Sequence, residues 1–172
     1  MSNTEVAHEY VPWRWVKYWH CVRCGKCCIK FLVPLYPHEA LYYIMKYGPV
    51  VEERNGKFYL RSKPDGSCVF LERTPLGYRC SIYLERPIVC RCYPFYVTDK
   101  PLGVVDSRDE DAVYVYRSPL GKSIKVYVYI DKVCSGIGRG IPLEIIIPKI
   151  VSEWITVLRL YRIHRDLRLY ST

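Results

Sequence analysis

The succession of hydrophobic and polar positions predicts short elements over most of the chain and one long helix at its end. Pro37 is suited to the first position of a helix, and His38 to Tyr47 continue it as far as Gly48-Pro49. After Pro148, residues 149–169 have a helical period. Its apolar positions fall on one side, at Ile150, Val151, Trp154, Val157, Leu158 and Tyr161. We expect this side to cover the apolar part of the fold.

Two pairs of β-rich segments predict hairpins. The first pairs residues 50–53 with 57–61 across Asn55-Gly56, a dipeptide that favours a tight hairpin turn. The second pairs residues 113–116 with 124–130. Short hairpins together with short helices indicate the α+β class rather than a regular sheet or bundle.

The middle of the chain is dense in Cys, Pro and Arg. Residues 68–95 predict loops, a short strand near 78–83 and one helical turn over 87–92. We therefore expect a small irregular cysteine-rich α+β domain, centred on metal, over residues 11–172, preceded by a flexible N-terminus over residues 1–10. The sequence contains no convincing boundary that would divide residues 11–172.

Length and composition suit one folded domain. The chain has 172 residues, half of them apolar, and a formal net charge of +9 with thiols counted as neutral. Eight thiolates on two divalent ions would lower that charge to roughly +5. A basic balance can indicate nucleic acid, but part of it would neutralise an anionic metal site. We therefore expect no nucleic-acid partner.

Composition also indicates the compartment. No signal peptide is visible, and the most apolar stretch, residues 141–151, is interrupted by prolines and charges. We expect a cytoplasmic protein without a membrane partner, in which thiols stay reduced and serve metal or redox chemistry. The absence of Gln and the presence of only two Asn indicate a thermophile, in which structural disulfides stay an open alternative.

The strongest motif is Cys21-x-x-Cys24-x-x-Cys27-Cys28, which places four thiols within eight residues. Gly25 allows the tight turn that curls a backbone around one cation. The C-x-x-C spacing is shared by zinc sites and iron–sulfur loops. Because adjacent side chains point in different directions, Cys27 and Cys28 need not serve the same metal.

Five more cysteines follow, each in a distinctive context. The segments are Asp65-Gly-Ser-Cys68-Val-Phe-Leu71, Cys80-Ser-Ile-Tyr83, Arg86-Pro-Ile-Val-Cys90-Arg-Cys92-Tyr-Pro-Phe95 and Cys134-Ser-Gly-Ile-Gly138. With the opening motif, these segments resemble in order the YkgJ-type cysteine cluster family, the CxxCxxCC zinc- or iron-chelating domain. The resemblance covers roughly residues 20–140.

The resemblance implies a set of eight ligands and leaves the metal open. The implied ligands are Cys21, Cys24, Cys27, Cys28, Cys68, Cys80, Cys90 and Cys134. Cys92 fills a position that the family pattern leaves variable, so we expect a buried or spare thiol there. All-thiolate ligation suits Zn²⁺ and iron–sulfur clusters alike. The ferredoxin-like opening favours iron–sulfur, in the form of a 4Fe-4S cluster.

Two arginines flank Cys90. Arg86 and Arg91 either donate hydrogen bonds to thiolates beside the metal or pair with nearby carboxylates. The functional hypothesis is a redox iron–sulfur protein that assists a modification reaction on another protein, because related cysteine patterns occur in flagellin lysine methylases. The alternative is a zinc-stabilised binding module without catalysis. The sequence does not decide whether the chain is an enzyme, and any protein partner is unidentified.

Overall fold

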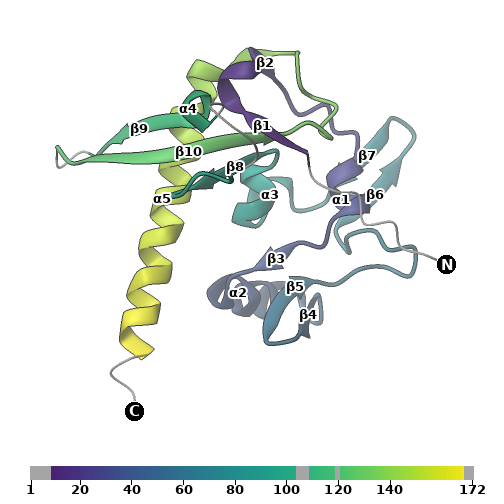
Figure 1. Cartoon of the computed structure of the whole chain (residues 1–172). Coiled ribbons are helices and arrows are strands. Elements are labelled where there is room, and N and C mark those ends of the chain that lie inside the picture. Colours follow the sequence, from purple (N-terminus) through teal and green to yellow (C-terminus); the bar gives the residue numbers. More distant parts are fainter. Residues whose placement is uncertain (1–8, 104–108, 119–120, 169–172) are drawn as a thin grey trace. The chain divides into compact units, whose positions relative to one another are not determined.

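The computed structural model describes residues 9–103, 109–118 and 121–168, which form two compact units. The first unit comprises residues 21–93, and the second comprises residues 9–20 and 94–168. Within the described residues there are five α-helices and only antiparallel strand pairs, which confirms the predicted α+β class (Figure 1). That residues 11–172 form a single domain stays a prediction.

The first unit consists of short elements. In chain order they are α1 (Lys26–Lys30), β3 (Pro34–Leu35), α2 (Pro37–Tyr47), β4 (Val51–Arg54), β5 (Lys57–Leu60), β6 (Leu71–Thr74), β7 (Gly77–Cys80), the 3-10 helix η2 (Tyr83–Glu85) and α3 (Ile88–Cys92). Strands β3, β5 and β4 form one sheet, against which α2 packs. Strands β6 and β7 form a separate hairpin.

Local sequence signals placed four of these elements correctly, namely α2, β4, β5 and α3. Helix α2 begins at Pro37 and ends before Gly48, whose φ of 78° continues no helix. The β4–β5 hairpin turns at Asn55 and Gly56 with φ values of 51° and 72°, the left-handed pair of a type I′ turn. Helix α3 matches the predicted helical turn.

The β6–β7 hairpin was only half predicted. The sequence indicated one strand near residues 78–83, whereas the strand ends at Cys80 and pairs with β6. Strand β6 has only four residues, two of them charged, so its alternation is too short to stand out from a loop. Pairing of Leu71 with Cys80 gives this cysteine a fixed register.

Cysteines form part of the core of the first unit. The buried cluster contains Cys68 among aliphatic and aromatic side chains such as Val33, Leu60 and Phe70. Three further cysteines, Cys28, Cys80 and Cys90, pack against this cluster. A polarisable thiol packs as a small hydrophobe when it is not ligated, so the cysteine segments share the unit's apolar core.

The second unit is built around one long strand. Its elements are β1 (Tyr10–Pro12), the 3-10 helix η1 (Trp13–Trp15), β2 (Tyr18–Trp19), β8 (Phe95–Thr98), α4 (Asp109–Ala112), β9 (Val113–Arg117), β10 (Ser123–Asp131), β11 (Ile141–Pro142) and α5 (Leu143–Arg168). Strand β10 pairs with β1, β8 and β9, and the β9–β10 hairpin confirms the second predicted hairpin. Strand β11 pairs with β2.

Helix α5 begins at Leu143, six residues earlier than predicted, and contains Pro148. The predicted helix began only after Pro148, because proline in a helix interior costs about 3 kcal/mol. The buried side chains of Leu143, Ile147 and Val151 are spaced four apart and form one helical stripe. Burying each contributes about 1.5–3 kcal/mol, which outweighs the cost of the proline. The predicted end at residue 169 lies outside the described residues.

The chain ends of the second unit differ in part from expectation. Tyr10, which the prediction placed in a flexible N-terminus, begins β1 and pairs with Asp131. Residues 1–8 lie outside the described residues. Helix α5 packs against β8 and β9, as expected for a helix that covers the apolar side of a sheet. In the part of the chain described here, no helix has the length and apolar character needed to cross a membrane.

Candidate metal centre

Helix α1 brings Cys27 and Cys28 together. Its N-cap is Gly25 with φ 71°, and the Gly25 carbonyl accepts hydrogen bonds from the N–H groups of Cys28 and Ile29, both at 3.0 Å. A Cβ atom on Gly25 would lie 2.7 Å from the Tyr78 ring, so only glycine fits at this position. The two thiol Sγ atoms lie 3.9 Å apart. Adjacent cysteines, expected to diverge, therefore face one another.

Backbone hydrogen bonds bring Cys68 and Cys80 to the same region. The N–H of Cys68 donates to the carbonyl of Cys28 at 2.7 Å. The Cys68 carbonyl accepts from the N–H of Leu71 at 2.9 Å, and Leu71 is paired with Cys80 across the β6–β7 hairpin. Helix α1, the turn before β6 and the end of β7 are thus joined through main-chain contacts.

Helix α3 supplies Cys90 and is held by α2. Glu39 of α2 accepts a hydrogen bond from the N–H of Ile88, the first residue of α3, at 2.8 Å. The other oxygen of the same carboxylate accepts from the N–H of Tyr36 at 3.1 Å. The Tyr43 hydroxyl donates to the carbonyl of Glu85 at 2.5 Å, just before α3. These contacts fix the segment that carries Cys90.

The ionisation of these cysteines shows that they share one region. A hydrogen bond with Cys28 lowers the pKa of Cys27 to about 7, against the opposing effect of burial. The same hydrogen bond, together with burial and the charges of Cys27, Cys68 and Cys90, raises the pKa of Cys28. Burial is the main cause of the raised pKa of Cys68, Cys80 and Cys90, and nearby thiols add to it. Like charges raise thiol pKa values only at short range.

Arg86 lies where positive charge would stabilise thiolates. It is among the groups that lower the pKa of Cys27, Cys80 and Cys90, although larger effects dominate each of these values. Its guanidinium lies 4.0 Å from the centre of the Tyr83 ring, and its Nε donates to the Tyr83 carbonyl at 2.9 Å. A supporting role for Arg91, which is exposed on α3, stays a prediction.

The other predicted ligands lie elsewhere in the chain. Cys21 and Cys24 are half-buried in the segment that precedes α1. Cys134 belongs to the second unit, where its Sγ accepts a hydrogen bond from Trp19 Nε1 at 3.4 Å. Its N–H donates to the carbonyl of Asp131 at 3.1 Å. That these three cysteines are ligands stays a prediction.

Cys92 differs from Cys90 although both lie on α3. Its side chain is buried, with 4% exposure. Residues two positions apart on an α-helix are separated by about 200° around the helix axis. Cys90 and Cys92 therefore face opposite sides of α3. The buried position of Cys92 agrees with the first part of the prediction of a buried or spare thiol, and that Cys92 is not a ligand stays a prediction.

The donor set fits a thiolate-bound metal. Two thiolates on one tetrahedral zinc, with bonds of about 2.3 Å, lie about 3.8 Å apart, close to the 3.9 Å between Cys27 and Cys28. Among the described residues, no three His, Cys, Asp or Glu side chains are already placed to hold an ion. Binding of one ion by three or more of these thiols therefore requires side chains to move from the positions described here.

Sequence reasoning missed the side chains that hold the cysteine segments in place. The Pro37-x-Glu39 pattern is a recognisable capping signal for α2. No sequence pattern indicates that Glu39 also reaches Ile88, because this contact joins residues 49 positions apart. Tyr43 likewise looked like an ordinary helix residue.

A comparison with known families supports metal chelation by the chain as a whole. The model of the CxxCxxCC family, described as a "putative zinc- or iron-chelating domain", matches residues 20–134. The chain is 30% identical over 88 residues to the uncharacterized protein MJ0661 of Methanocaldococcus jannaschii. That alignment covers 46% of this chain and 46% of MJ0661, so it spans about half of each protein. No solved structure matches the chain.

Proposed function

Because the chain belongs to the CxxCxxCC family of zinc- or iron-chelating domains, we propose that it binds metal through a thiolate centre in the first unit. The ligands of this centre are drawn from Cys27, Cys28, Cys68, Cys80 and Cys90. One observation carries the proposal: the Cys27 and Cys28 thiols lie 3.9 Å apart, and Cys28, Cys80 and Cys90 pack against the buried cluster that contains Cys68.

Zinc is the ion that the local geometry supports best. The separation of 3.9 Å between Cys27 and Cys28 suits two ligands of one tetrahedral ion. Four of the five thiols complete a Cys₄ site, and the fifth remains beside it. Bound zinc would act as a structural crosslink between α1, the turn before β6, β7 and α3. Because such a crosslink exists only in the folded chain, metal binding contributes directly to the free energy of folding.

An iron–sulfur cluster is the second candidate, favoured by the C-x-x-C-x-x-C spacing of Cys21, Cys24 and Cys27. In a 4Fe-4S cluster each cysteine binds a different iron, so Cys27 and Cys28 would not share one metal atom as they would in a zinc site. The cluster would supply electron transfer, in line with a redox role or with assistance to a protein-modification reaction. Arg86 would stabilise the anionic cluster from its place beside Tyr83.

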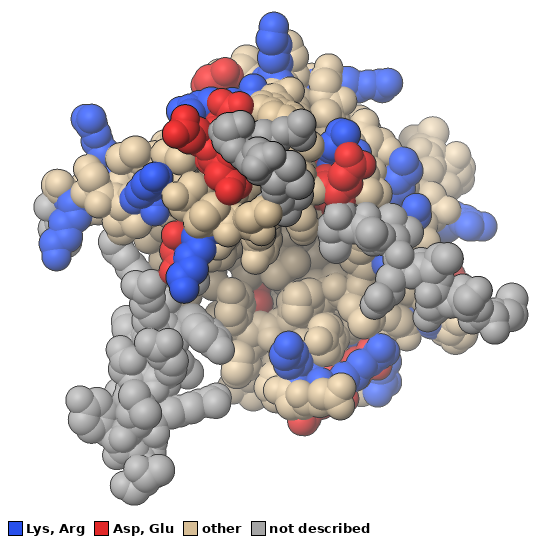
Figure 2. Space-filling view, in the orientation of Figure 1, with Lys and Arg blue, Asp and Glu red and all other residues tan. Residues whose placement is uncertain are grey.

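The remaining predicted ligands extend the proposal. Cys21, Cys24 and Cys134 would complete a second centre or replace members of the first. A cytoplasmic location is part of the same proposal, because reduced thiols are needed to bind metal. On the face shown in Figure 2, Lys and Arg side chains are scattered, several of them beside Asp or Glu. That the partner is not a nucleic acid stays a prediction.

The test is purification without oxygen, followed by elemental analysis and an absorption spectrum. We expect zinc or iron bound to each chain, with no visible colour if zinc fills the centre and a brown protein if an iron–sulfur cluster does. Alkylation should modify at least four more thiols after the metal is removed than before. A protein that contains no metal, and whose nine thiols all react before chelation, would exclude a thiolate centre.

A further inference from the structure

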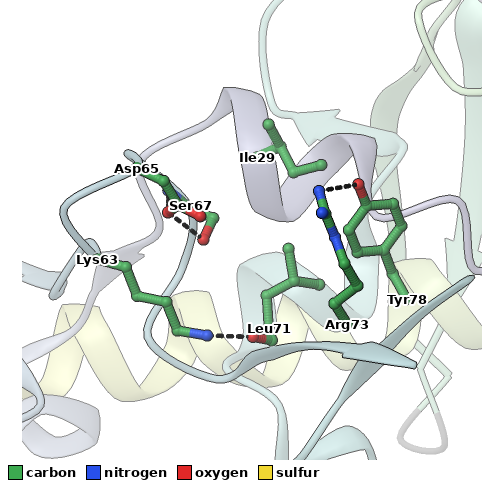
Figure 3. Close-up of a pocket in the computed structure, with 7 residues that line it drawn as sticks. All are labelled: Ile29, Lys63, Asp65, Ser67, Leu71, Arg73 and Tyr78. Carbon is green, nitrogen blue, oxygen red and sulfur yellow. Dashed lines mark hydrogen bonds between the residues drawn. The ribbon is translucent and has the colours of Figure 1, made fainter. Parts of the chain in front are cut away.

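The first unit contains a pocket that the metal centre does not use. Its volume is about 320 Å³, within the range of about 300–1,000 Å³ typical of small-ligand sites. Figure 3 shows side chains from three segments around it: Ile29 of α1, Lys63 and Ser67 from the turn before β6, and Tyr78 of β7. Side chains from β6 complete the wall.

Two cations border this pocket, and among the described residues neither forms a direct ion pair, although the charge of Lys63 helps to lower the pKa of Asp65. The Lys63 ammonium donates a hydrogen bond to the carbonyl of Leu71. The guanidinium of Arg73 lies 5.7 Å from the centre of the Tyr78 ring and donates to the Tyr78 hydroxyl at 3.4 Å. Both contacts are with neutral groups, so each cation retains donors for an anion.

One acid also lies at the pocket, but its oxygen is already bonded. Asp65 accepts hydrogen bonds from the N–H and the hydroxyl of Ser67, at 3.0 and 2.6 Å. These bonds hold the pKa of Asp65 below its usual value. Two cations and one carboxylate leave the lining with a net charge of +1, which is balanced by a ligand with one negative charge rather than two.

The remaining wall is apolar. Ile29 and Leu71 extend toward the space between the two cations in Figure 3, and the Tyr78 ring lies beside Arg73. An apolar wall of this kind packs against a short hydrocarbon group. An inorganic ion alone would leave it unfilled.

From these features we propose that the pocket binds a small organic carboxylate with a short apolar tail. The carboxylate pairs with Arg73 and Lys63, and the tail lies on Ile29 and Leu71. A planar guanidinium can hold a carboxylate through two parallel hydrogen bonds, which gives the ligand a defined orientation. No cysteine lines the pocket, although Ile29 and Ser67 are chain neighbours of Cys28 and Cys68.

The test is calorimetric titration of the metal-loaded protein with hexanoate and with its neutral analogue hexanamide. Hexanoate should bind, and hexanamide should bind more weakly by about tenfold or more, since charge-assisted hydrogen bonds are lost. Arg73→Met should weaken hexanoate binding by a similar factor. Arg79→Met is the matched control, because Arg79 lies in the same hairpin but pairs with Glu72 at 2.5 Å and does not line the pocket.

Lys63→Met is a second variant, which should also weaken hexanoate binding. The metal content of each sample is measured as well, so that the loss of hexanoate binding can be distinguished from the loss of metal. Equal affinities for hexanoate and hexanamide would overturn the proposal. So would equal effects of Arg73→Met and Arg79→Met, or the absence of saturable hexanoate binding in protein with its metal in place.

Discussion

Replacing Glu39 by alanine should destabilise the first unit and weaken its hold on metal. One carboxylate serves two segments in this fold. It accepts from the N–H of Tyr36 at the start of α2 and from the N–H of Ile88 at the start of α3. Removing it leaves both donors without their acceptor, and Ile88 lies in a buried position with 5% exposure.

The magnitude follows from these two bonds. An unsatisfied N–H at the buried Ile88 costs about 1–3 kcal/mol. Loss of the capping contact at Tyr36, which is half-buried, costs about 0.5–1 kcal/mol. We therefore expect the free energy of unfolding to fall by about 1.5–4 kcal/mol. For a chain of this size that corresponds to a melting temperature lower by about 3–16 °C. Glu39→Gln, which keeps one acceptor oxygen, should lose about half as much.

The assays are thermal unfolding by circular dichroism and competition for the metal with a chelator. Cys90 lies two residues after Ile88, so a frayed α3 should release metal more readily. Glu72→Ala is the control, because it removes an exposed ion pair with Arg79 and should cost less than about 1 kcal/mol. If Glu39→Ala were as stable as Glu72→Ala and held metal equally well, the carboxylate would not position α3.

Four further predictions follow from the geometry. Cys90→Ser should reduce bound metal, whereas Cys92→Ser should leave it unchanged, as measured by elemental analysis; equal losses would show that the wrong cysteine was excluded. Gly25→Ala should destabilise the chain by about 2 kcal/mol or more, seen in denaturant unfolding, because its φ of 71° disfavours a side chain and the Tyr78 ring occupies the space. The thiols of Cys28, Cys68, Cys80 and Cys90 have raised pKa values and are protonated at neutral pH. Metal binding should therefore release about three or four protons per ion and should weaken as the pH falls. Calorimetry in several buffers measures the number of protons released. Pro148→Ala should stabilise α5 by about 1–3 kcal/mol in thermal unfolding, and an unchanged melting temperature would show that the proline costs nothing there.

Local signals predicted elements well where a single residue type has a strong conformational preference. Helix α2 begins at Pro37 and ends before Gly48, and Asn55-Gly56 forms the turn of the β4–β5 hairpin. Both follow from the backbone preferences of these residues. The same reasoning failed at Pro148, where a preference of about 3 kcal/mol was opposed by the burial of a helical stripe. Burial depends on the partner surface, which no local pattern reveals.

The candidate site likewise has features that the sequence predicted and contacts that it did not. Cysteine spacing and context predicted metal binding, and the family whose model matches is described as zinc- or iron-chelating. The contact between Cys27 and Cys28 depends on the helical turn after Gly25, which the sequence analysis did not predict. Lys63 and Arg73 carry no motif, since their shared pocket arises from the turn before β6 and the β6–β7 hairpin.

The central claim is that metal is held by sulfur from the cysteines of the first unit. X-ray absorption at the metal edge of protein purified without oxygen measures the identity of the ligands directly. We expect a first shell of about four sulfur atoms at about 2.3 Å from zinc or iron. A first shell dominated by nitrogen or oxygen, or protein that carries no zinc or iron, would contradict it.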